Sequence, residues 1–267
     1  MSKKRLDALL VEKGFYDSRE KARRAVMAGE VFVNGVIEDK PGTGFNEDSV
    51  FAVKQNSNPY AGRGGLKLEK ALDYFKIDLN GKTAVDIGAS TGGFTDCMLQ
   101  KGAAKVYAID VGYGQIAWKL RQDSRVIVME RTNMRYVKPE DIGELADFAA
   151  ADVSFISLEK ILPAVNQILS QNGEFICLVK PQFEAGRDKV GKHGVVRDAE
   201  THKEVLIKVA GSAEAGGFKF KGVTFSPIKG PAGNIEFLLF LSKGAEAMSE
   251  AKSSIEAVVA EAHFVLD

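Results

Sequence analysis

The sequence contains only two cysteines, Cys97 and Cys177, among its 267 residues. Two isolated cysteines do not make a disulfide framework, and such scarcity is typical of proteins that fold in a reducing cytoplasm. The three histidines, His193, His202 and His263, lack the spacing of zinc ligands. We therefore expect neither a disulfide scaffold nor a metal site.

Long apolar runs are also absent. No stretch approaches the roughly 18 to 20 apolar residues that a membrane-spanning helix needs. The basic start, MSKKR, is not followed by the apolar stretch of a secretory signal. We expect a cytoplasmic protein with no membrane partner. The sequence leaves the oligomeric state open, with a monomer favoured.

The chain has no excess charge of either sign, because 36 Lys and Arg balance 36 Asp and Glu. Any binding to nucleic acid therefore has to come from a local basic patch. A hydrophobic content of 45% and a charged content of 27% are ordinary for a soluble globular protein. The length allows one medium domain and one small domain.

Residues 1–54 have the pattern of a small α+β domain. RLDALLVEKG and SREKARRAVMAG have apolar residues at helical spacing, and VFVNGVI and SVFAV alternate like strands, with Asn34-Gly35 as a hairpin turn. The first 30 residues carry eight basic and five acidic side chains, a local net charge of +3. Two interpretations stay open: a phosphate-binding surface, or a solvated helix face with ion pairs along it. Polar residues 55–62 are predicted to be a linker, and residues 63–267 the larger domain.

The larger domain is organised around Ala84 to Asp96, AVDIGASTGGFTD. An apolar strand that breaks into a glycine-rich turn and continues as a helix is the nucleotide-binding corner of a doubly wound α/β sheet. Glycine lets the backbone come close to a ligand there, since any Cβ would stand in the way. The spacing, Asp-x-Gly-x-x-x-Gly-Gly, suits a ligand with an adenosine and an amino-acid tail. S-adenosylmethionine is the first candidate, and a purely structural tight turn is the alternative.

Strands and helices are predicted to alternate through the larger domain, as in a Rossmann-like, seven-stranded, mostly parallel sheet. The predicted strands are 83–87, 104–109, 125–129, 147–151, 175–179, 218–225 and 235–241. The predicted helices are 63–75, 93–101, 114–121, 157–170, 199–215 and 245–262. The last two strands follow each other closely enough to form an antiparallel pair.

Several polar side chains follow the predicted strands. Asp110 ends the second strand, where an acidic residue accepts hydrogen bonds from ribose hydroxyls. The segment 130–133 follows the third strand, where such a fold contacts an adenine. Asp152 and Lys180 end the fourth and fifth strands, and a lysine that ends an apolar run is an unusual place for a hydrated charge. Two of these residues also have a non-functional interpretation. Asp110 would then only cap the next turn, and Lys180 would be a lysine at the end of a strand that extends into solvent.

Lys67, on the helix before the first strand, and Glu236, near the last strand, would separately suggest only a surface lysine and an exposed strand residue. Two lysines and two carboxylates together would suit transfer to a ribose hydroxyl. A lysine base has to be neutral, and burial or a second nearby ammonium lowers a lysine pKa. The carboxylates would hold the lysines in place.

The whole pattern resembles a known family. The strings GRGGLKL, DIGASTGGFT, YAIDVGYGQIAWKLR, ERTN, ADVSFISL, LVKPQFEAG and GPAGNIE resemble the TlyA family of rRNA 2′-O-ribose methyltransferases, which is related to FtsJ. The resemblance implies a catalytic tetrad of Lys67, Asp152, Lys180 and Glu236, with the later lysine as base. It also implies a cofactor site for S-adenosylmethionine, formed by Asp86, Gly88, Ser90, Gly92, Asp110 and Asp152. It suggests a cytidine as the target.

The first fifty residues resemble the RNA-binding module named after ribosomal protein S-four. The resemblance rests on Arg5-Leu6-Asp7, Gly14, Ser18-Arg19, Ala22, Gly29, Val31 and Val33-Asn34-Gly35. It implies binding to structured RNA by shape and phosphate contacts. The loop 182–198 is long and basic, so we expect an RNA-contacting lid, with a disordered surface loop as the alternative. The candidate RNA-binding residues are Arg5, Arg19, Arg23, Arg24, Arg63, Arg187, Lys189 and Lys192.

Three functions are compatible with this pattern. The first is S-adenosylmethionine-dependent 2′-O-methylation of ribosomal RNA, either free or in ribosomal subunits. The second is a non-catalytic protein that binds RNA or the ribosome, which would predict that some of the four catalytic candidates are replaced, and none is. The third is a membrane-lytic protein, since relatives have been labelled haemolysins, and the missing apolar segments rank it last.

Overall fold

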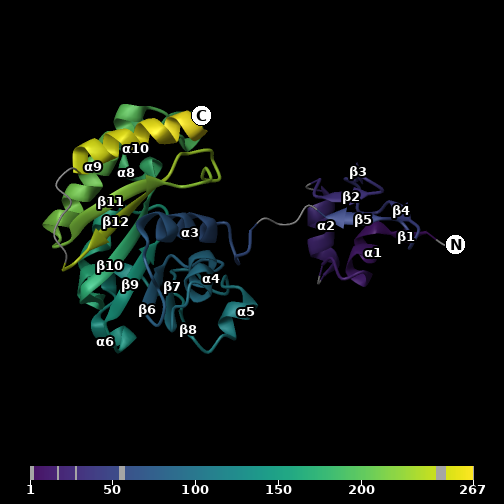
Figure 1. Cartoon of the computed structure of the whole chain (residues 1–267), viewed down its shortest axis with the longest axis horizontal. Coiled ribbons are helices and arrows are strands. Elements are labelled where there is room, and N and C mark those ends of the chain that lie inside the picture. Colours follow the sequence, from purple (N-terminus) through teal and green to yellow (C-terminus); the bar gives the residue numbers. More distant parts are fainter. Residues whose placement is uncertain (1–2, 17, 28, 54–57, 245–250, 267) are drawn as a thin grey trace. The chain divides into compact units, whose positions relative to one another are not determined.

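In the computed structural model, the described residues are 3–16, 18–27, 29–53, 58–244 and 251–266. The chain divides into two units, residues 1–57 and residues 58–267 (Figure 1). Of the predicted linker, residues 55–57 lie outside the described residues. Residues 58–62 belong to the second unit.

The first unit is the small α+β domain that the sequence predicted. Its elements are β1 (Lys4–Arg5), α1 (Leu6–Glu12), α2 (Arg19–Met27), β2 (Val31–Val33), β3 (Val36–Ile37), β4 (Gly44–Phe45) and β5 (Phe51–Val53). The strands β3-β2-β5 form an antiparallel sheet, and β1 pairs with β4. Asn34 and Gly35 have φ of 52° and 83°, and two positive φ values are what a type I′ hairpin turn requires. Apolar residues of both helices and of β2 pack into one core.

The second unit contains the seven-stranded sheet. Its elements up to β9 are α3 (Gly64–Phe75), β6 (Thr83–Ile87), α4 (Gly93–Gln100), β7 (Lys105–Ile109), α5 (Trp118–Arg121), β8 (Val126–Met129), η1 (Met134–Tyr136), α6 (Pro139–Ile142) and β9 (Ala146–Ala151). They continue as η2 (Leu158–Lys160), α7 (Leu162–Ile168), β10 (Leu169–Val179), α8 (Pro181–Glu184), η3 (Arg187–Lys189), η4 (Lys192–Gly194), α9 (Ala199–Ala215), β11 (Lys219–Phe225), β12 (Phe237–Ser242) and α10 (Ala251–Leu266).

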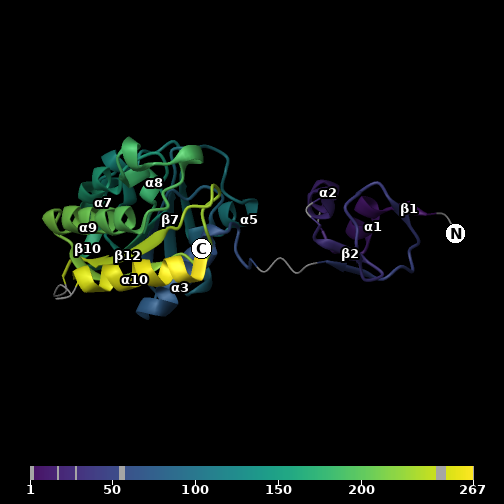
Figure 2. The ribbon, with the colours of Figure 1, turned by 90° about the horizontal axis from the view of Figure 1, so that it is seen from above.

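The strand order is β11-β12-β10-β9-β6-β7-β8, and β12 alone runs against its neighbours. Both faces of the sheet are covered, with α7 and α9 on one side and α3 on the other (Figure 2). In β6, Val85 and Ile87 join the core beneath α7 and α9, while Ala84 joins the core beneath α3 and α4. A parallel strand that is buried on both faces has a nearly continuous apolar sequence, and β6 could be predicted for this reason.

This topology brings the predicted site to one edge of the sheet. Strands β6, β7, β9 and β10 are parallel, so their carboxyl ends meet there. The antiparallel β12 begins at the same edge, since Phe237 pairs with Val179. Glu236 therefore comes just before the strand end that lies beside Lys180.

Two predicted helices are shorter than expected. The helix predicted at 114–121 begins only at Trp118, because the N–H groups of Gly112 and Gly114 bond to the carboxylates of Asp110 and Glu130. The helix predicted at 157–170 becomes η2 and α7, because Pro163 lacks an N–H and occupies the first turn of α7. Its last two residues, 169 and 170, belong to β10, which begins six residues before the strand predicted at 175–179. Of the predicted terminal helix, residues 245–250 lie outside the described residues, and α10 runs from Ala251 to Leu266. Within the described ranges, no helix is both long and apolar enough to cross a membrane.

Candidate active site

The glycine turn after β6 packs directly against the end of β9. Gly88 has a φ of +85°, and a Cβ at this position would lie 2.5 Å from the carbonyl oxygen of Asp152. At Gly92, with a φ of +93°, a Cβ would lie 2.3 Å from a methyl group of Leu120. Gly88 therefore permits the contact between the turn and β9, whereas Gly92 permits close packing against α5.

Replacing Gly88 with alanine should cost more stability than the same change at Gly114. Gly114 also has a positive φ, of +70°, but nothing lies within 4 Å of its Cβ position, so Gly114→Ala should cost only the backbone strain of about 1 kcal/mol. Gly88→Ala adds the clash with Asp152, roughly 1–3 kcal/mol more. Urea unfolding followed by circular dichroism measures both variants. Equal losses would contradict the close approach of the two strand ends.

Asp86 fastens the start of α4 to β6. Its Oδ2 accepts hydrogen bonds from the backbone N–H (2.8 Å) and the hydroxyl (2.6 Å) of Thr95. Its Oδ1 is buried without a hydrogen-bond partner among the described residues. Burial raises the pKa of Asp86 to about 7, and nearby Asp152 and Asp110 add to the increase, while the Thr95 hydrogen bonds oppose it. The side chain, although predicted to bind cofactor, borders neither of the two cavities described below.

The raised pKa of Asp86 predicts a pH-dependent difference between the wild type and Asp86→Asn. An ordinary aspartate titrates near 4 in the unfolded chain, so between about pH 4 and 7 only the folded state keeps this proton. The contribution of Asp86 to stability therefore falls by up to about 1.4 kcal/mol per pH unit as pH rises through this window. The variant lacks this slope, so its stability relative to wild type should increase from pH 4 to pH 7. Urea unfolding at several pH values tests this, and a pH-independent difference would contradict it.

A cavity of about 710 Å³ opens at the ends of β6 and β7. Asp110 borders it, and the two carboxylate oxygens of Asp110 accept hydrogen bonds from the backbone N–H of Ser90 (2.8 Å) and of Gly112 (2.6 Å). The carboxylate is thus fixed by backbone groups and still faces the cavity. We call this space the β6–β7 cavity, and its other lining residues include Ile87, Gly88, Ser90, Ile109, Val111, Thr132, Asn133, Met134, Asp152, Ser154, Phe155 and Ile156.

Only half of the segment predicted to contact an adenine borders this cavity. Thr132 and Asn133 do. Glu130 instead forms an ion pair with Arg121 at 2.5 Å, and the guanidinium of Arg131 lies 4.4 Å from the ring centre of Tyr113.

All four predicted catalytic residues border a second cavity, of about 560 Å³. Lys67 Nζ and Glu236 Oε2 are 2.5 Å apart, and only 8% and 1% of these side chains are exposed. Lys180 Nζ lies 2.6 Å from Asp152 Oδ1 and donates a hydrogen bond to Ser154 Oγ at 2.7 Å. The sequence-level alternative of an exposed Glu236 is therefore wrong. We call this space the tetrad cavity.

The two cavities share one wall, formed by Gly88, Ser90, Asp152, Ser154 and Phe155. Phe155 stands out in this wall because it is 91% exposed and has a positive φ of 63°. Its ring lies 5.0 Å from that of Phe183. Sequence reasoning missed Ser154 and Phe155, although both belong to the string ADVSFISL.

In the first unit, Arg5, Arg19, Arg23 and Arg24 border one concave surface of about 640 Å³. Arg5 and Arg19 both bond to Asp7, which is fully buried. The hydrogen bond from Arg5, together with Arg19, holds the pKa of Asp7 below its usual range despite burial. Arg24 pairs with Glu20, and Arg23 forms no ion pair with any residue that the structure describes.

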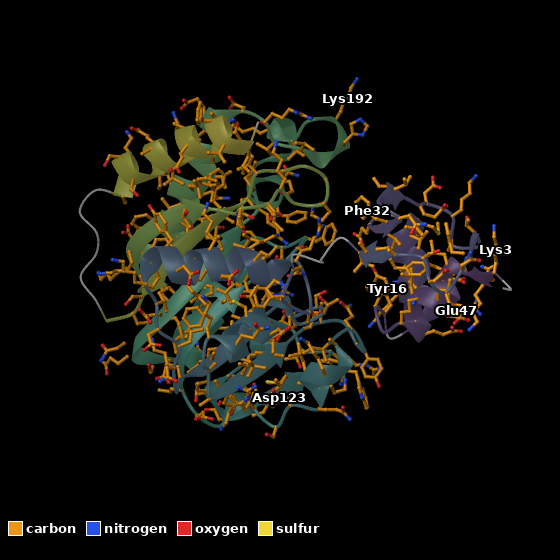
Figure 3. The ribbon with its side chains drawn as sticks, turned by 45° about the vertical axis from the view of Figure 1, so that its right-hand side comes forward. Lys3, Tyr16, Phe32, Glu47, Asp123 and Lys192 are labelled. Atoms are coloured by element: carbon orange, nitrogen blue, oxygen red, sulfur yellow. The ribbon has the colours of Figure 1, made fainter. Side chains whose placement is uncertain are left out.

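The predicted lid, residues 182–198, contains most of α8 and the short turns η3 and η4. Val190, His193 and Gly194 border the tetrad cavity. Lys189 pairs with Glu204, and Lys192 points into solvent (Figure 3). The side chain of Arg187 lies outside what the structure describes. Arg63 is exposed just before α3 and borders a small cavity of about 120 Å³ beside the glycine turn.

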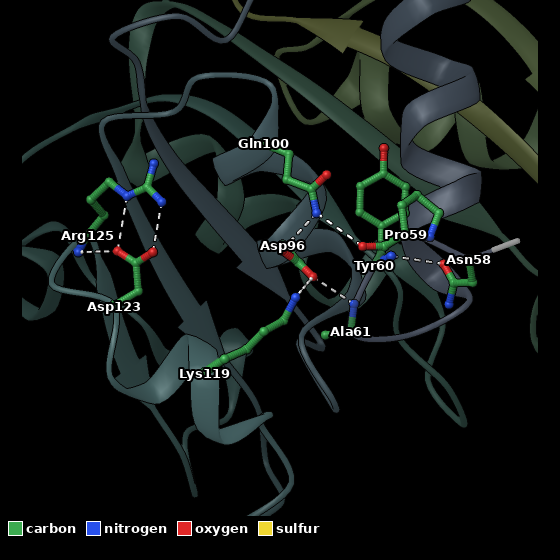
Figure 4. Close-up of polar contacts among 9 residues, drawn as sticks. All are labelled: Asn58, Pro59, Tyr60, Ala61, Asp96, Gln100, Lys119, Asp123 and Arg125. Carbon is green, nitrogen blue, oxygen red and sulfur yellow. Dashed lines mark hydrogen bonds and ion pairs between the residues drawn. The ribbon is translucent and has the colours of Figure 1, made fainter. Parts of the chain in front are cut away.

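Residues 58–62 are packed against α4, which the sequence did not predict. The backbone N–H of Ala61 donates to Asp96 Oδ2 at 2.8 Å, and the side chain of Gln100 donates to the carbonyl of Pro59 at 3.2 Å (Figure 4). Lys119 pairs with Asp96 at 2.6 Å. The chain entering α3 is thus tied to the helix that follows the glycine turn. Across the described ranges, no group of three or more His, Cys, Asp or Glu side chains is placed to hold a metal ion.

A known family model matches each of the two units. Residues 60–243 match the FtsJ-like methyltransferase family, and residues 4–49 match the S4 domain. The chain is 53% identical to YqxC of Bacillus subtilis, a candidate rRNA methyltransferase, over 99% of this chain and 95% of that protein. It is 43% identical to the 16S/23S rRNA (cytidine-2′-O)-methyltransferase TlyA of Mycobacterium tuberculosis, over 95% of each. A solved structure from Streptococcus thermophilus, described as a candidate hemolysin, is 49% identical with a TM-score of 0.79, covering 99% of this chain and 97% of that one.

Proposed function

Because the chain belongs to the FtsJ-like methyltransferase family and carries an S4 domain, we propose that it methylates the 2′-hydroxyl of a cytidine ribose in ribosomal RNA, using S-adenosylmethionine. The family predicted from the sequence is thereby confirmed. The relative in Mycobacterium tuberculosis is named as a cytidine-2′-O-methyltransferase, which supports cytidine as the target nucleoside. A ribosomal RNA substrate would place the reaction in the cytoplasm.

The observation that carries the proposal is the shared wall between the two cavities. One cavity is lined by the glycine turn and by Asp110, which would suit a nucleoside-like ligand, and the other is lined by two lysine–carboxylate pairs. A methyl donor held in the first cavity and an acceptor hydroxyl held in the second would meet beside the residues that line both. Such transfer depends mainly on bringing two groups into line and on accepting one proton.

The β6–β7 cavity fits S-adenosylmethionine. Its volume of about 710 Å³ lies within the usual range for small-ligand sites. The carboxylate of Asp110 would accept hydrogen bonds from the ribose, and Thr132 and Asn133 would contact the adenine among apolar neighbours. Gly88 and Ser90 would bring the backbone of the turn close to the ligand. When bound, the cofactor supplies an activated methyl group.

Lys180 is the side chain that we assign as base. Its two partners, Asp152 and Ser154, both border the wall between the cavities. A target hydroxyl bound at that wall would have its proton close to Lys180 Nζ. The ammonium must first lose one proton, after which the amine would accept the hydroxyl proton as the new C–O bond replaces the S–C bond of the methyl donor. Asp152 and Ser154 hold the nitrogen in place throughout.

Lys67 and Glu236 form the second pair of the tetrad cavity. The ammonium of Lys67 places a positive charge where the hydroxyl oxygen becomes more negative during proton removal. Glu236 compensates that charge, which would otherwise be costly to bury.

Two surfaces would bind the RNA. The exposed ring of Phe155 stands at the shared wall, where an unstacked base could lie against it. The basic concave surface of the first unit, with Arg5, Arg19, Arg23 and Arg24, suits phosphate contacts. Arg63, Arg187, Lys189 and Lys192 in the second unit are further candidates.

Methyl transfer from labelled S-adenosylmethionine to free rRNA and to small and large ribosomal subunits tests the proposal. We expect wild-type protein to label at least one of these substrates. If no rRNA or subunit accepts label while the protein binds RNA, the chain is a non-catalytic RNA-binding protein instead.

A further inference from the structure

Glu184, the last residue of α8, is a buried carboxylate outside both cavities. It is 6% exposed, yet both of its oxygens accept hydrogen bonds. The backbone N–H of Leu158 donates to Oε1 at 2.7 Å, and the hydroxyl of Ser157 donates to Oε2 at 2.8 Å. A side chain from the loop after β10 thus holds two successive residues of the loop after β9.

These two loops carry half of the tetrad. We define the β9 loop as residues 152–158 and the β10 loop as residues 180–184. At the tetrad cavity they meet through the contacts of Lys180 with Asp152 and Ser154 and through the ring pair Phe155–Phe183. Glu184 joins the same two loops at the other end of the β9 loop. The positions of Asp152 and Lys180 relative to each other therefore depend on contacts at both ends.

We propose that Glu184 is a positioning residue, which holds the β9 loop so that Asp152 and Ser154 keep Lys180 in line with the target hydroxyl. This inference rests on the proposed methyl transfer. Glu184 itself touches neither cavity and takes no part in the proton transfer.

The local energetics favour a positioning role over simple packing. Burial raises the pKa of Glu184, while the bonds from Leu158 and Ser157 oppose the increase, so keeping an acid here costs stability. An apolar side chain would fill the space without that cost, but it could not hold two donors at once. The positive φ of Phe155, between Asp152 and Ser157, is another strained feature of the β9 loop that its surroundings have to maintain.

The test compares Glu184→Ala, Glu184→Gln and Ser157→Ala with a control, Glu144→Ala, at a more exposed carboxylate. Glu144 also joins separate elements, accepting hydrogen bonds from Lys105, Tyr107 and Thr83, but it precedes β9 and so lies at the opposite edge of the sheet. The measurements are Tm, the Kd for S-adenosylmethionine, and kcat and KM for rRNA methylation.

We expect Glu184→Ala to lower kcat about tenfold or more, because small misplacements of reacting groups can cost up to about 10²-fold. The Kd for S-adenosylmethionine and the KM for rRNA should change by a smaller factor than kcat, since Asp110, Thr132 and Asn133 of the β6–β7 cavity and the basic surface of the first unit lie outside the β9 loop. Glu184→Gln should recover most of kcat, because its amide oxygen can accept from Leu158 and its nitrogen can donate to Ser157. Ser157→Ala should lower kcat by a smaller factor.

A loss of kcat in Glu184→Ala no larger than in Glu144→Ala would overturn the inference while leaving the proposed function intact. If Glu184→Ala fails to fold, the kcat values of Ser157→Ala and Glu184→Gln test the inference instead. The inference is then wrong if Ser157→Ala keeps the full kcat. An inactive wild-type protein would instead contradict the proposed function.

Discussion

Lys180→Ala is expected to lower the rate of rRNA methylation by about 10²–10⁴-fold, the range that a general base contributes. The variant removes the only one of the two lysines whose partners, Asp152 and Ser154, border both cavities. Binding of S-adenosylmethionine should change little, because Lys180 does not border the β6–β7 cavity. Single-turnover methylation and calorimetric binding measure the two effects.

Lys180→Arg and Lys82→Ala serve as controls. Arginine keeps the positive charge but stays protonated, so Lys180→Arg should be nearly as slow as Lys180→Ala. Lys82 also pairs with a carboxylate, that of Glu174 at 2.7 Å, but borders neither cavity, and Lys82→Ala should keep full activity. An active Lys180→Ala variant would show that another group takes the proton.

Glu236→Ala is expected to cost about 3–5 kcal/mol of folding free energy, the usual loss when one partner of a buried ion pair is removed. The reason is that the ammonium of Lys67, only 8% exposed, would be left without the carboxylate that lies 2.5 Å away. Urea unfolding of wild type and variant measures this. A loss below about 1 kcal/mol would mean that Lys67 reaches solvent or another partner.

The double variant Lys67→Met with Glu236→Leu separates stability from catalysis. Replacing both partners by apolar side chains of similar size is often neutral or stabilising, so the double variant should be about as stable as wild type. It should nevertheless lose methylation, because both charges are gone from the tetrad cavity. A stable and fully active double variant would show that Lys67 and Glu236 contribute only to packing and not to catalysis.

Most of the sheet could be predicted, because β7, β8, β9 and β12 are short apolar runs that polar residues follow. β10 begins six residues earlier than predicted, because its first half, LSQNG, is not an apolar run. The run TAVDIGAS both identified β6 and located the turn that borders the two cavities. The two-residue strands β1 and β4 could not be predicted, because two residues show no alternation. The late start of α5 could not be predicted either, since it depends on the carboxylates of Asp110 and Glu130, which accept hydrogen bonds from the N–H groups before it.

The four residues of the proposed tetrad could be named from the sequence, but the way in which they pair could not. Lys67 and Glu236 lie far apart in the sequence, and only the fold brings them together. Taken separately, each would be interpreted as an ordinary surface residue. The family resemblance, rather than periodicity, identified both. Ser154, Phe155 and Glu184 could not be singled out from the sequence, because each contacts a neighbouring loop and no spacing rule records such contacts.

The central claim is that the methyl group goes to a ribose hydroxyl rather than to a base. The most direct measurement is mass spectrometry of nucleosides from rRNA that the wild-type protein has methylated with isotope-labelled S-adenosylmethionine. The account predicts that the label appears in 2′-O-methylcytidine, and that Lys180→Ala abolishes that product. Label on the cytosine ring or on another base would contradict it.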